Sequence, residues 1–203
     1  EKIDYNSHVV SVRAIGGRCK LPYDRLIVAA GSQLRRPNLP GFDVWTFNVD
    51  TYNEAVRLED HLIDLGKRVP STGRNHVVVV GAGTTGIEVA CEMTDRLKKN
   101  GIYQGRITLI DSLPYIGSHM GENARPVIEE ALVELKIHTC TGVSIGSFDQ
   151  NGIVLAGGER IESDTIIWAG GLEANELAKT FRVNTDGSGR LPVDGYLRVL
   201  GVA

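Results

Sequence analysis

The residues with the clearest potential for chemistry are Gly81, Gly83 and Gly86, which follow the run Val77–Val80 with the spacing Gly-x-Gly-x-x-Gly. In such a turn the first glycine permits a sharp turn out of a strand, the second lets a pyrophosphate approach the backbone, and the third lets a helix pack tightly. The first N–H groups of that helix would face the phosphates, with the positive end of the helix dipole behind them. A glycine-rich turn without a ligand is the alternative. The predicted phosphate-binding residues are Gly81, Ala82, Gly83, Thr84, Thr85 and Gly86.

An acidic residue supports this interpretation. Asp111 ends a second apolar run, Ile107–Ile110, and lies 25 positions after Gly86. A carboxylate at the end of the second strand can accept hydrogen bonds from the hydroxyl groups of an adenosine ribose. It would also repel a 2′-phosphate by on the order of a few kcal/mol. Ser112 follows Asp111, and no arginine occurs in the next few residues, so we predict contacts from Asp111 and Ser112 and a preference for NADH over NADPH. The alternative is a solvated aspartate at a strand end.

The elements that must position these residues alternate between strands and helices, which predicts an α/β fold. The four valines suit a strand buried on both faces. The expected elements are a helix over 51–66 with Asp50 or Thr51 as N-cap and Gly66 as its end, the strand Val77–Val80, a helix with apolar residues from Ile87 to Leu97, the strand Ile107–Ile110, a helix over 123–135, a strand over 137–141, a β-meander over 142–161, the strand Thr165–Ala169, and a final strand over 191–199.

Composition restricts the classes of function. The chain has 203 residues, of which 42% are apolar and 23% charged, as is ordinary for a globular protein. A net charge of −3 gives no reason to expect nucleic acid or an anionic membrane as a partner. No apolar run approaches the length of a membrane span. Three cysteines and five histidines are scattered along the chain, which predicts reduced thiols, no metal site and a cytoplasmic location.

Two distant segments resemble each other. Residues 17–31 and 157–171 align without gaps, so that Asp24 meets Asp164 and Gly31 meets Gly171. Each reads as the end of a β-meander followed by a buried strand that terminates in small residues. Unless the similarity is chance, we expect the same place in two related nucleotide-binding domains. The second copy has a glycine turn upstream and the first has none, so we expect the chain to be part of a longer protein.

With these motifs in view, the chain resembles the two-dinucleotide-domain flavoprotein reductases, the FAD/NAD(P) pyridine nucleotide-disulfide oxidoreductases, and most of all their type II NADH dehydrogenase branch. The similarity rests on four blocks in order, over 23–42, 77–93, 164–171 and 191–199. It implies a Rossmann-like three-layer NAD(P)-binding domain with a β-meander, plus a partial FAD-domain segment. The implied divisions are 1–45 as the trailing part of the FAD domain, 46–175 as the NAD(P)H-binding domain, and 176–203 as a return toward the FAD domain.

The resemblance also implies a mechanism. NADH would pass a hydride to FAD, which would reduce a quinone or a redox protein. Glu88, expected on the first turn of the glycine-turn helix, is the candidate catalytic residue that positions the nicotinamide ring or relays a proton; a glutamate that only complements the helix dipole is the alternative. Ala169, Gly170 and Gly171 should border the cofactor crevice. The glycine turn for FAD is absent from the chain, so FAD binding is expected only in a longer parent protein, and this part alone should be inactive.

Other readings remain open at this point. One is a stand-alone NAD(H)-binding sensor or interaction module without catalysis. The unmatched first copy of the repeat argues against it, because such a module would not need part of a flavin domain. An NADPH-dependent disulfide or ferredoxin reductase is disfavoured by Asp111. A homodimer and peripheral membrane attachment of the longer parent are further readings that the sequence leaves open.

Overall fold

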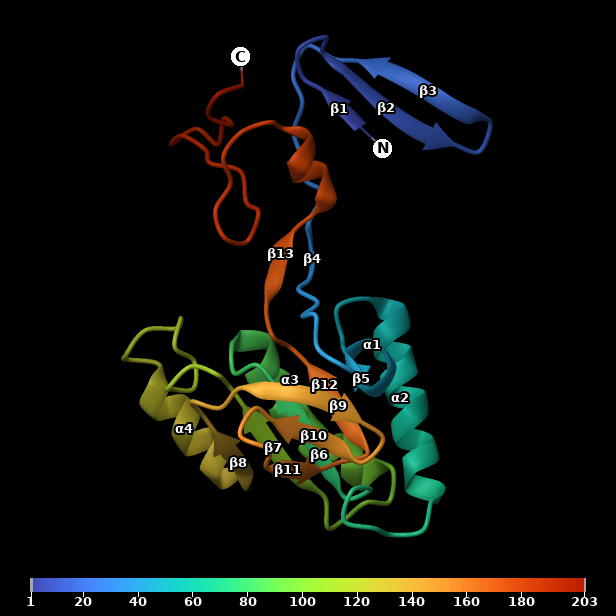
Figure 1. The fold of residues 1–203 in the computed structure, drawn as a ribbon, viewed down its shortest axis with the longest axis vertical. Helices are drawn as coiled ribbons and strands as arrows, with labels where there is room; N and C mark the ends of the chain where they lie inside the picture. Colours follow the sequence, from blue (N-terminus) through green and yellow to red (C-terminus); the bar gives the residue numbers. More distant parts are fainter. Residues whose placement is uncertain (1, 203) are drawn as a thin grey trace. The chain divides into compact units, whose positions relative to one another are not determined.

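The computed structural model describes residues 2–202, which form two compact units (Figure 1). One unit comprises residues 36–171. The other is built from the residues up to Arg35 together with those from Leu172 onward.

A five-stranded parallel sheet is the centre of the unit 36–171. Its strand order is β5 (Thr46–Phe47), β12 (Thr165–Trp168), β6 (His76–Val80), β7 (Arg106–Ile110) and β8 (Ile137–Cys140). The valine run of β6 occupies the middle of the sheet, and all four valines are at most 6% exposed. The prediction of a strand buried on both faces is therefore confirmed.

The unit has three layers: the helices, the parallel sheet and the meander. Val77 and Val79 of β6 face a core shared with α2 (Tyr52–Lys67), α3 (Thr84–Lys99) and α4 (Arg125–Glu134). Val78 and Val80 face the opposite core, which is shared with the meander β9 (Ile145–Asp149), β10 (Gly152–Leu155) and β11 (Arg160–Glu162), and with α1 (Phe42–Trp45). The period of two in a strand separates these two cores. The predicted three-layer α/β fold with a β-meander is confirmed.

The helices begin and end for identifiable reasons. Thr51 is the N-cap of α2, as expected, and its Oγ1 accepts a hydrogen bond from Glu54 N at 3.3 Å. The helix does not stop at Gly66, as the sequence suggested, but continues to Lys67. Gly66 instead permits close packing, because a Cβ there would overlap the carbonyl oxygen of Asn100. Helix α4 is shorter than the predicted span 123–135.

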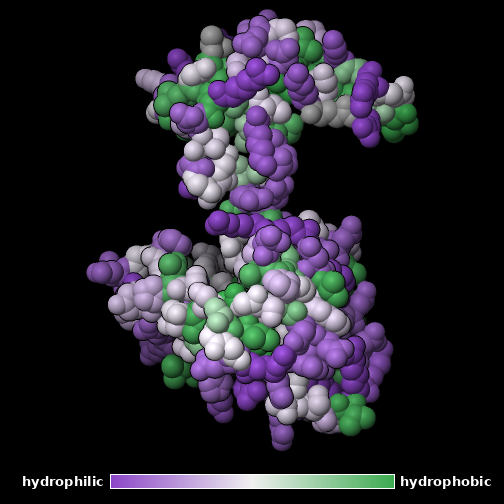
Figure 2. Space-filling view, in the orientation of Figure 1, coloured by the Kyte–Doolittle hydropathy of each residue, from purple (hydrophilic) through white to green (hydrophobic). Residues whose placement is uncertain are grey.

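The second unit contains two small sheets. Strands β1 (Lys2–Asp4), β2 (Val9–Ala14) and β3 (Gly17–Pro22) form an antiparallel sheet. Strand β4 (Ser32–Leu34) pairs with β13 (Leu172–Ala174), a pairing that sequence patterns did not indicate. A short 3₁₀ helix, Glu176–Thr180, follows β13, and the ring of Phe181 stacks on Tyr5 with centroids 5.7 Å apart. Hydrophilic side chains are spread over the visible face of both units, with apolar residues between them (Figure 2).

Two expected strands are absent from this second unit. Residues 26–30 form no strand, although their counterpart in the proposed repeat forms β12, and Ile27 is 90% exposed. No strand among residues 2–202 pairs with this segment, so its backbone has no ladder to join. The tail 191–199 contains only an isolated bridge, Val193 to Val199. Asp194 Oδ1 accepts hydrogen bonds from the N–H groups of Tyr196 and Arg198 and closes a turn in place of a strand.

Among the described residues, no helix combines the length and the apolar content that crossing a bilayer requires. Where the protein resides in the cell stays a prediction.

Candidate nucleotide-binding site

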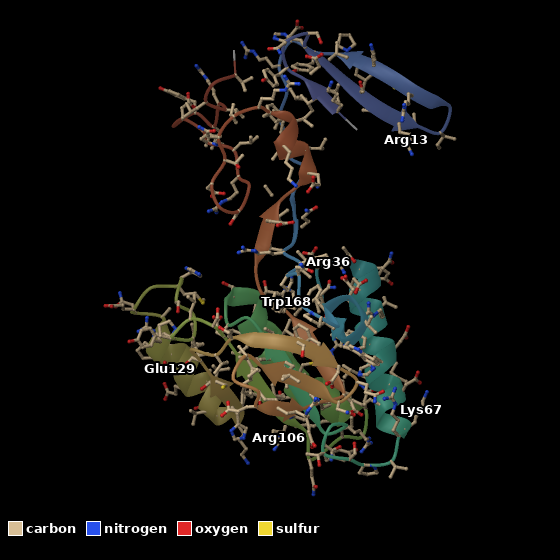
Figure 3. All side chains as sticks on the ribbon, in the orientation of Figure 1. Arg13, Arg36, Lys67, Arg106, Glu129 and Trp168 are labelled. Carbon is tan, nitrogen blue, oxygen red and sulfur yellow. The ribbon has the colours of Figure 1, made fainter. Side chains whose placement is uncertain are left out.

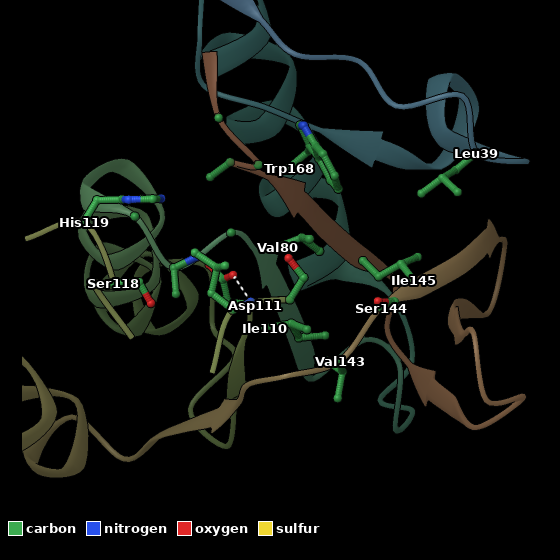
Figure 4. Close-up of a pocket in the computed structure, with 18 residues that line it drawn as sticks. Leu39, Val80, Ile110, Asp111, Ser118, His119, Val143, Ser144, Ile145 and Trp168 are labelled. Carbon is green, nitrogen blue, oxygen red and sulfur yellow. Dashed lines mark hydrogen bonds between the residues drawn. The ribbon is translucent and has the colours of Figure 1, made fainter. Parts of the chain in front are cut away.

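A pocket of about 440 Å³ lies at the carboxyl ends of β12, β6 and β7, within the unit 36–171 (Figure 4). Ligands of open α/β sheets bind at this edge. Several residues singled out from the sequence meet here. The pocket is lined by Leu39, Val80, Gly81, Ala82, Gly83, Ile110, Asp111, Ser112, Leu113, Ser118, His119, Val143, Ser144, Ile145, Trp168, Ala169, Gly170 and Gly171.

The glycines of the turn between β6 and α3 differ in what they permit. Gly81 has a φ of +103°, and a Cβ there would overlap the carbonyl oxygen of Ala169. A Cβ on Gly86 would overlap the carbonyl oxygen of Gly81. The fold itself therefore requires both. Gly83 has an ordinary φ of −79°, and a Cβ there would meet no atom within 4 Å. Gly83 thus faces open space that a ligand can occupy.

Asp111 is fastened to the same turn. Its Oδ2 accepts a hydrogen bond from Ala82 N at 2.6 Å, and its Oδ1 accepts one from Leu113 N at 2.8 Å (Figure 4). Bonds to a carboxylate are the stronger kind. Each oxygen retains a second lone pair, and the side chain is only half-buried, so further donors can reach it. Asp111 both fixes the glycine turn and presents acceptors to the pocket.

The loops after β7 and after β8 complete the walls of the pocket, and the sequence did not reveal them. The loop after β7 is tied to the turn by Gly117 N, which donates to the carbonyl oxygen of Ala82 at 2.9 Å. It brings Ser118 and His119 to one side of the pocket, whereas Leu39 and Trp168 lie on the other (Figure 4). The signal that could have found the loops is their position after the carboxyl ends of parallel strands, where ligand-binding loops gather.

Some of the predicted residues lie outside the lining. Thr84 and Thr85 are exposed at the start of α3, and Gly86 is buried beneath it. Glu88 is exposed and is the fifth residue of α3. The expectation that it lies on the first turn was wrong, because the helix begins at Thr84, directly after the turn. Its proposed role stays a prediction.

Among the strands that end at the pocket, His76 has the largest change in pKa, and it lies at the end of β6 that is away from the pocket. His76 is the first residue of β6 and is 3% exposed, and burial lowers its pKa to about 4. Its Nδ1 lies 2.7 Å from the carbonyl oxygen of Glu162, and its Nε2 lies 2.8 Å from Thr108 Oγ1. Burial favours the neutral ring and outweighs the opposite effect of the Glu162 carbonyl oxygen. These contacts join β6 to β7 and to the meander, which makes His76 a structural residue.

The parallel sheet, the meander on one face and the glycine turn with its acidic partner define a Rossmann-like α/β domain. The sequence model of the pyridine nucleotide-disulphide oxidoreductase family matches residues 1–202. The chain therefore belongs to this family of oxidoreductases.

Individual relatives are consistent with this assignment. The chain is 46% identical over 185 residues to the NADH dehydrogenase-like protein Rv1812c of Mycobacterium tuberculosis, covering 89% of this chain and 46% of the relative. It is 28% identical to the type II NADH:quinone oxidoreductase NdhA of the same organism, covering 98% of this chain and 47% of the relative. The chain thus spans about half the length of the curated relatives it matches. Among solved structures, NDH2 from Plasmodium falciparum in complex with NADH superposes with a TM-score of 0.83 at 24% identity, covering 99% of this chain and 46% of that one, which shows the shared fold.

Proposed function

We propose that the pocket binds NADH and that the chain is the NADH-binding part of an FAD-dependent NADH:acceptor oxidoreductase. The observation that supports this most is the bond between Asp111 and Ala82, because it unites an acid for the ribose with the turn for the phosphates. The pyrophosphate would lie beside Gly83 and accept hydrogen bonds from the free N–H groups at the start of α3. Asp111 would accept from the ribose, with Ser112 beside it, and Ala169, Gly170 and Gly171 would border the other half of the cofactor.

Asp111 also supports the choice between the two nicotinamide cofactors. A carboxylate that accepts hydrogen bonds from two backbone N–H groups is held in a fixed position. A 2′-phosphate next to it would meet a like charge. This disfavours the alternative of an NADPH-dependent disulfide or ferredoxin reductase. The type II NADH:quinone oxidoreductases among the relatives agree with NADH as the donor.

The second unit supports a flavin domain in the parent protein. Residues Val28–Ser32 line a separate pocket of about 430 Å³ within this unit, and a Cβ on Gly31 would meet no atom within 4 Å. Leu26, Ile27 and Val28 are exposed apolar residues in an extended segment, as expected for a strand whose neighbours belong to a longer chain. The residues fit the edge of a cofactor site but include no second glycine turn.

We therefore infer that the unit made of the residues up to Arg35 and from Leu172 onward belongs to an FAD domain of the parent, and that the unit 36–171 is the NADH domain. The divisions implied by the resemblance, 1–45, 46–175 and 176–203, differ from these because α1 packs in the core of the parallel sheet and β13 pairs with β4. FAD, when bound by the parent, would accept the hydride and pass electrons to a quinone or a redox protein. The unit up to Arg35 has no evident use in a stand-alone NAD(H) sensor, which makes that alternative weaker. A homodimer and peripheral membrane attachment of the parent stay predictions.

The position of the pyrophosphate can be tested by replacing Gly83, because the fold does not require a glycine there. Gly83→Ala should leave the melting temperature within a few degrees of the wild type, because its Cβ enters open space. It should weaken NADH binding by about tenfold or more, because the methyl group occupies the space beside the pyrophosphate. Gly157→Ala is the matched control: it also faces open space but lies outside the pocket, so it should change neither quantity.

Isothermal titration of the chain with NADH, NADPH and FAD provides the readout. Unchanged NADH affinity in Gly83→Ala would contradict the proposed position of the pyrophosphate. Binding of FAD without binding of NADH would assign the turn to the wrong cofactor.

A further inference from the structure

Trp168, which the sequence did not single out as a binding residue, ends a row of side chains that crosses the pocket floor. In the parallel register of the sheet, Trp168 of β12 lies opposite Val80 of β6, and Val80 lies opposite Ile110 of β7. All three side chains point to the meander side of the sheet and line the pocket. The row therefore leads from the adenosine side, next to Asp111, to the far side of β6.

The strand order decides what each end of this row can meet. The glycine turn follows β6, Asp111 follows β7, and β12 is the neighbour of β6 on the opposite side. Neighbouring strands lie about 4.8 Å apart. If the pyrophosphate lies over the end of β6 and the adenosine over the end of β7, the remaining half of the dinucleotide extends over the end of β12. The pocket there is lined by Trp168 and by the small residues Ala169, Gly170 and Gly171.

The indole of Trp168 is held in place before any ligand arrives. It meets the ring of Phe42 edge to face, with centroids 5.2 Å apart and planes at 86°, and the ring of Phe148 at 6.4 Å and 85°. On another side it packs against Gly170, where a Cβ would overlap the indole ring. An aromatic surface with one fixed orientation loses little conformational entropy when a flat ligand binds to it. Trp168 remains half-buried and stands at the pocket edge of the sheet, opposite the end that carries Arg106 (Figure 3).

We propose that Trp168 is the contact that recognises the nicotinamide half of NADH, through aromatic packing between the indole and the nicotinamide ring. This inference rests on the proposed function. It adds to it a residue that makes the affinity for the complete cofactor higher than the affinity for its fragment without nicotinamide. Gly170 has a specific part in the arrangement, because any larger residue would displace the indole from this position.

A pair of ligands tests the inference. ADP-ribose has the adenosine, the pyrophosphate and the second ribose of NADH but no nicotinamide. Both ligands are titrated into the chain and into Trp168→Leu. NADH should bind about two- to twelvefold more weakly to the variant, the range that one aromatic pair contributes, whereas ADP-ribose affinity should stay within about twofold. Trp168→Phe, which retains a ring, should recover most of the NADH affinity. Trp45→Leu changes a tryptophan outside the pocket and should leave both affinities unchanged.

The ratio of the two dissociation constants carries the conclusion, because a loss of folded protein affects both ligands equally and cancels. An equal loss for NADH and ADP-ribose in Trp168→Leu would overturn the role of Trp168 while leaving NADH binding intact. Equal affinities of the wild type for ADP-ribose and NADH would also overturn the role of Trp168, because the nicotinamide would then contribute nothing to binding. Failure of both ligands to bind the wild type would instead contradict the proposed function itself.

Discussion

Replacing Asp111 with asparagine removes one negative charge from the pocket and one acceptor from the glycine turn, while the size of the side chain stays the same. The carboxylate now accepts from Ala82 N and from Leu113 N, one bond on each oxygen. An amide has one oxygen and one NH₂ group, which cannot accept. One of the two backbone N–H groups therefore loses its partner, at a cost of about 1–2 kcal/mol in the free energy of unfolding.

The change in cofactor preference has a separate origin. Two like charges about 4 Å apart repel by about 4 kcal/mol at an effective dielectric constant near 20. Because Asp111 is half-buried beside an open pocket, solvent and salt reduce this to on the order of 2 kcal/mol. Removing the charge should therefore narrow the ratio between the NADPH and NADH dissociation constants by about 30-fold. Most of this should come from tighter NADPH binding.

The assay is titration of wild type and Asp111→Asn with both cofactors at low and high salt, together with urea unfolding. Asp149→Asn is the matched control, because Asp149 Oδ1 also accepts a backbone hydrogen bond, from Asn151 N, but lies outside the pocket. It should lose stability without changing the cofactor ratio. If Asp111→Asn loses stability and its cofactor ratio stays that of the wild type, Asp111 only braces the turn and the argument for NADH specificity is wrong.

Two further predictions concern the other end of the sheet. Burial lowers the pKa of His76 from 6.5 to about 4, so the unfolded state binds more protons between these values and stability is lost as the pH falls through them. Urea unfolding measures how far the free energy of unfolding decreases between pH 7 and pH 5. This decrease should be about 2 kcal/mol smaller in His76→Gln than in the wild type, and equal decreases would contradict the assignment. Arg74, which is 7% exposed, donates to the carbonyl oxygens of Leu65 and Gly66 at the end of α2. Arg74→Ala should cost about 3 kcal/mol by urea unfolding, against less than about 0.5 for the exposed Lys67→Ala, and similar values would refute a capping role.

How much of this molecule could be predicted depends on whether its determinants are local. The valine run, the glycine spacing and the amphipathic helix lie within one continuous stretch, so β6, the turn and α3 could be read directly. The repeat shows the limit. Residues 26–30 and β12 have similar sequences, yet only β12 forms a strand, because β5 and β6 lie on either side of it. Strand formation is decided by pairing and burial more than by intrinsic preference.

The same distinction applies to the pocket. Asp111 was found because it directly follows the second apolar strand, but its bond to Ala82 joins residues that only the folded sheet brings together. Ser118 and His119 come from a loop without any pattern of its own. Trp168 looked like the end of a buried strand, and its place in the pocket depends on Phe42 and Phe148, which are distant in sequence.

The order of strands in the sheet, and not their order in the chain, explains how one pocket could read a whole dinucleotide. Strand β12 is the last of the parallel strands in sequence but lies beside β6, the first of the three that end at the pocket. Asp111, proposed for the adenosine half, and Trp168, proposed for the nicotinamide half, therefore flank a single glycine turn. Because β6 separates the strand of Trp168 from the strand that Asp111 follows, the two substitutions should act independently. Their effects on the free energy of NADH binding should add, whereas a large coupling would show that the row of floor residues moves as one body.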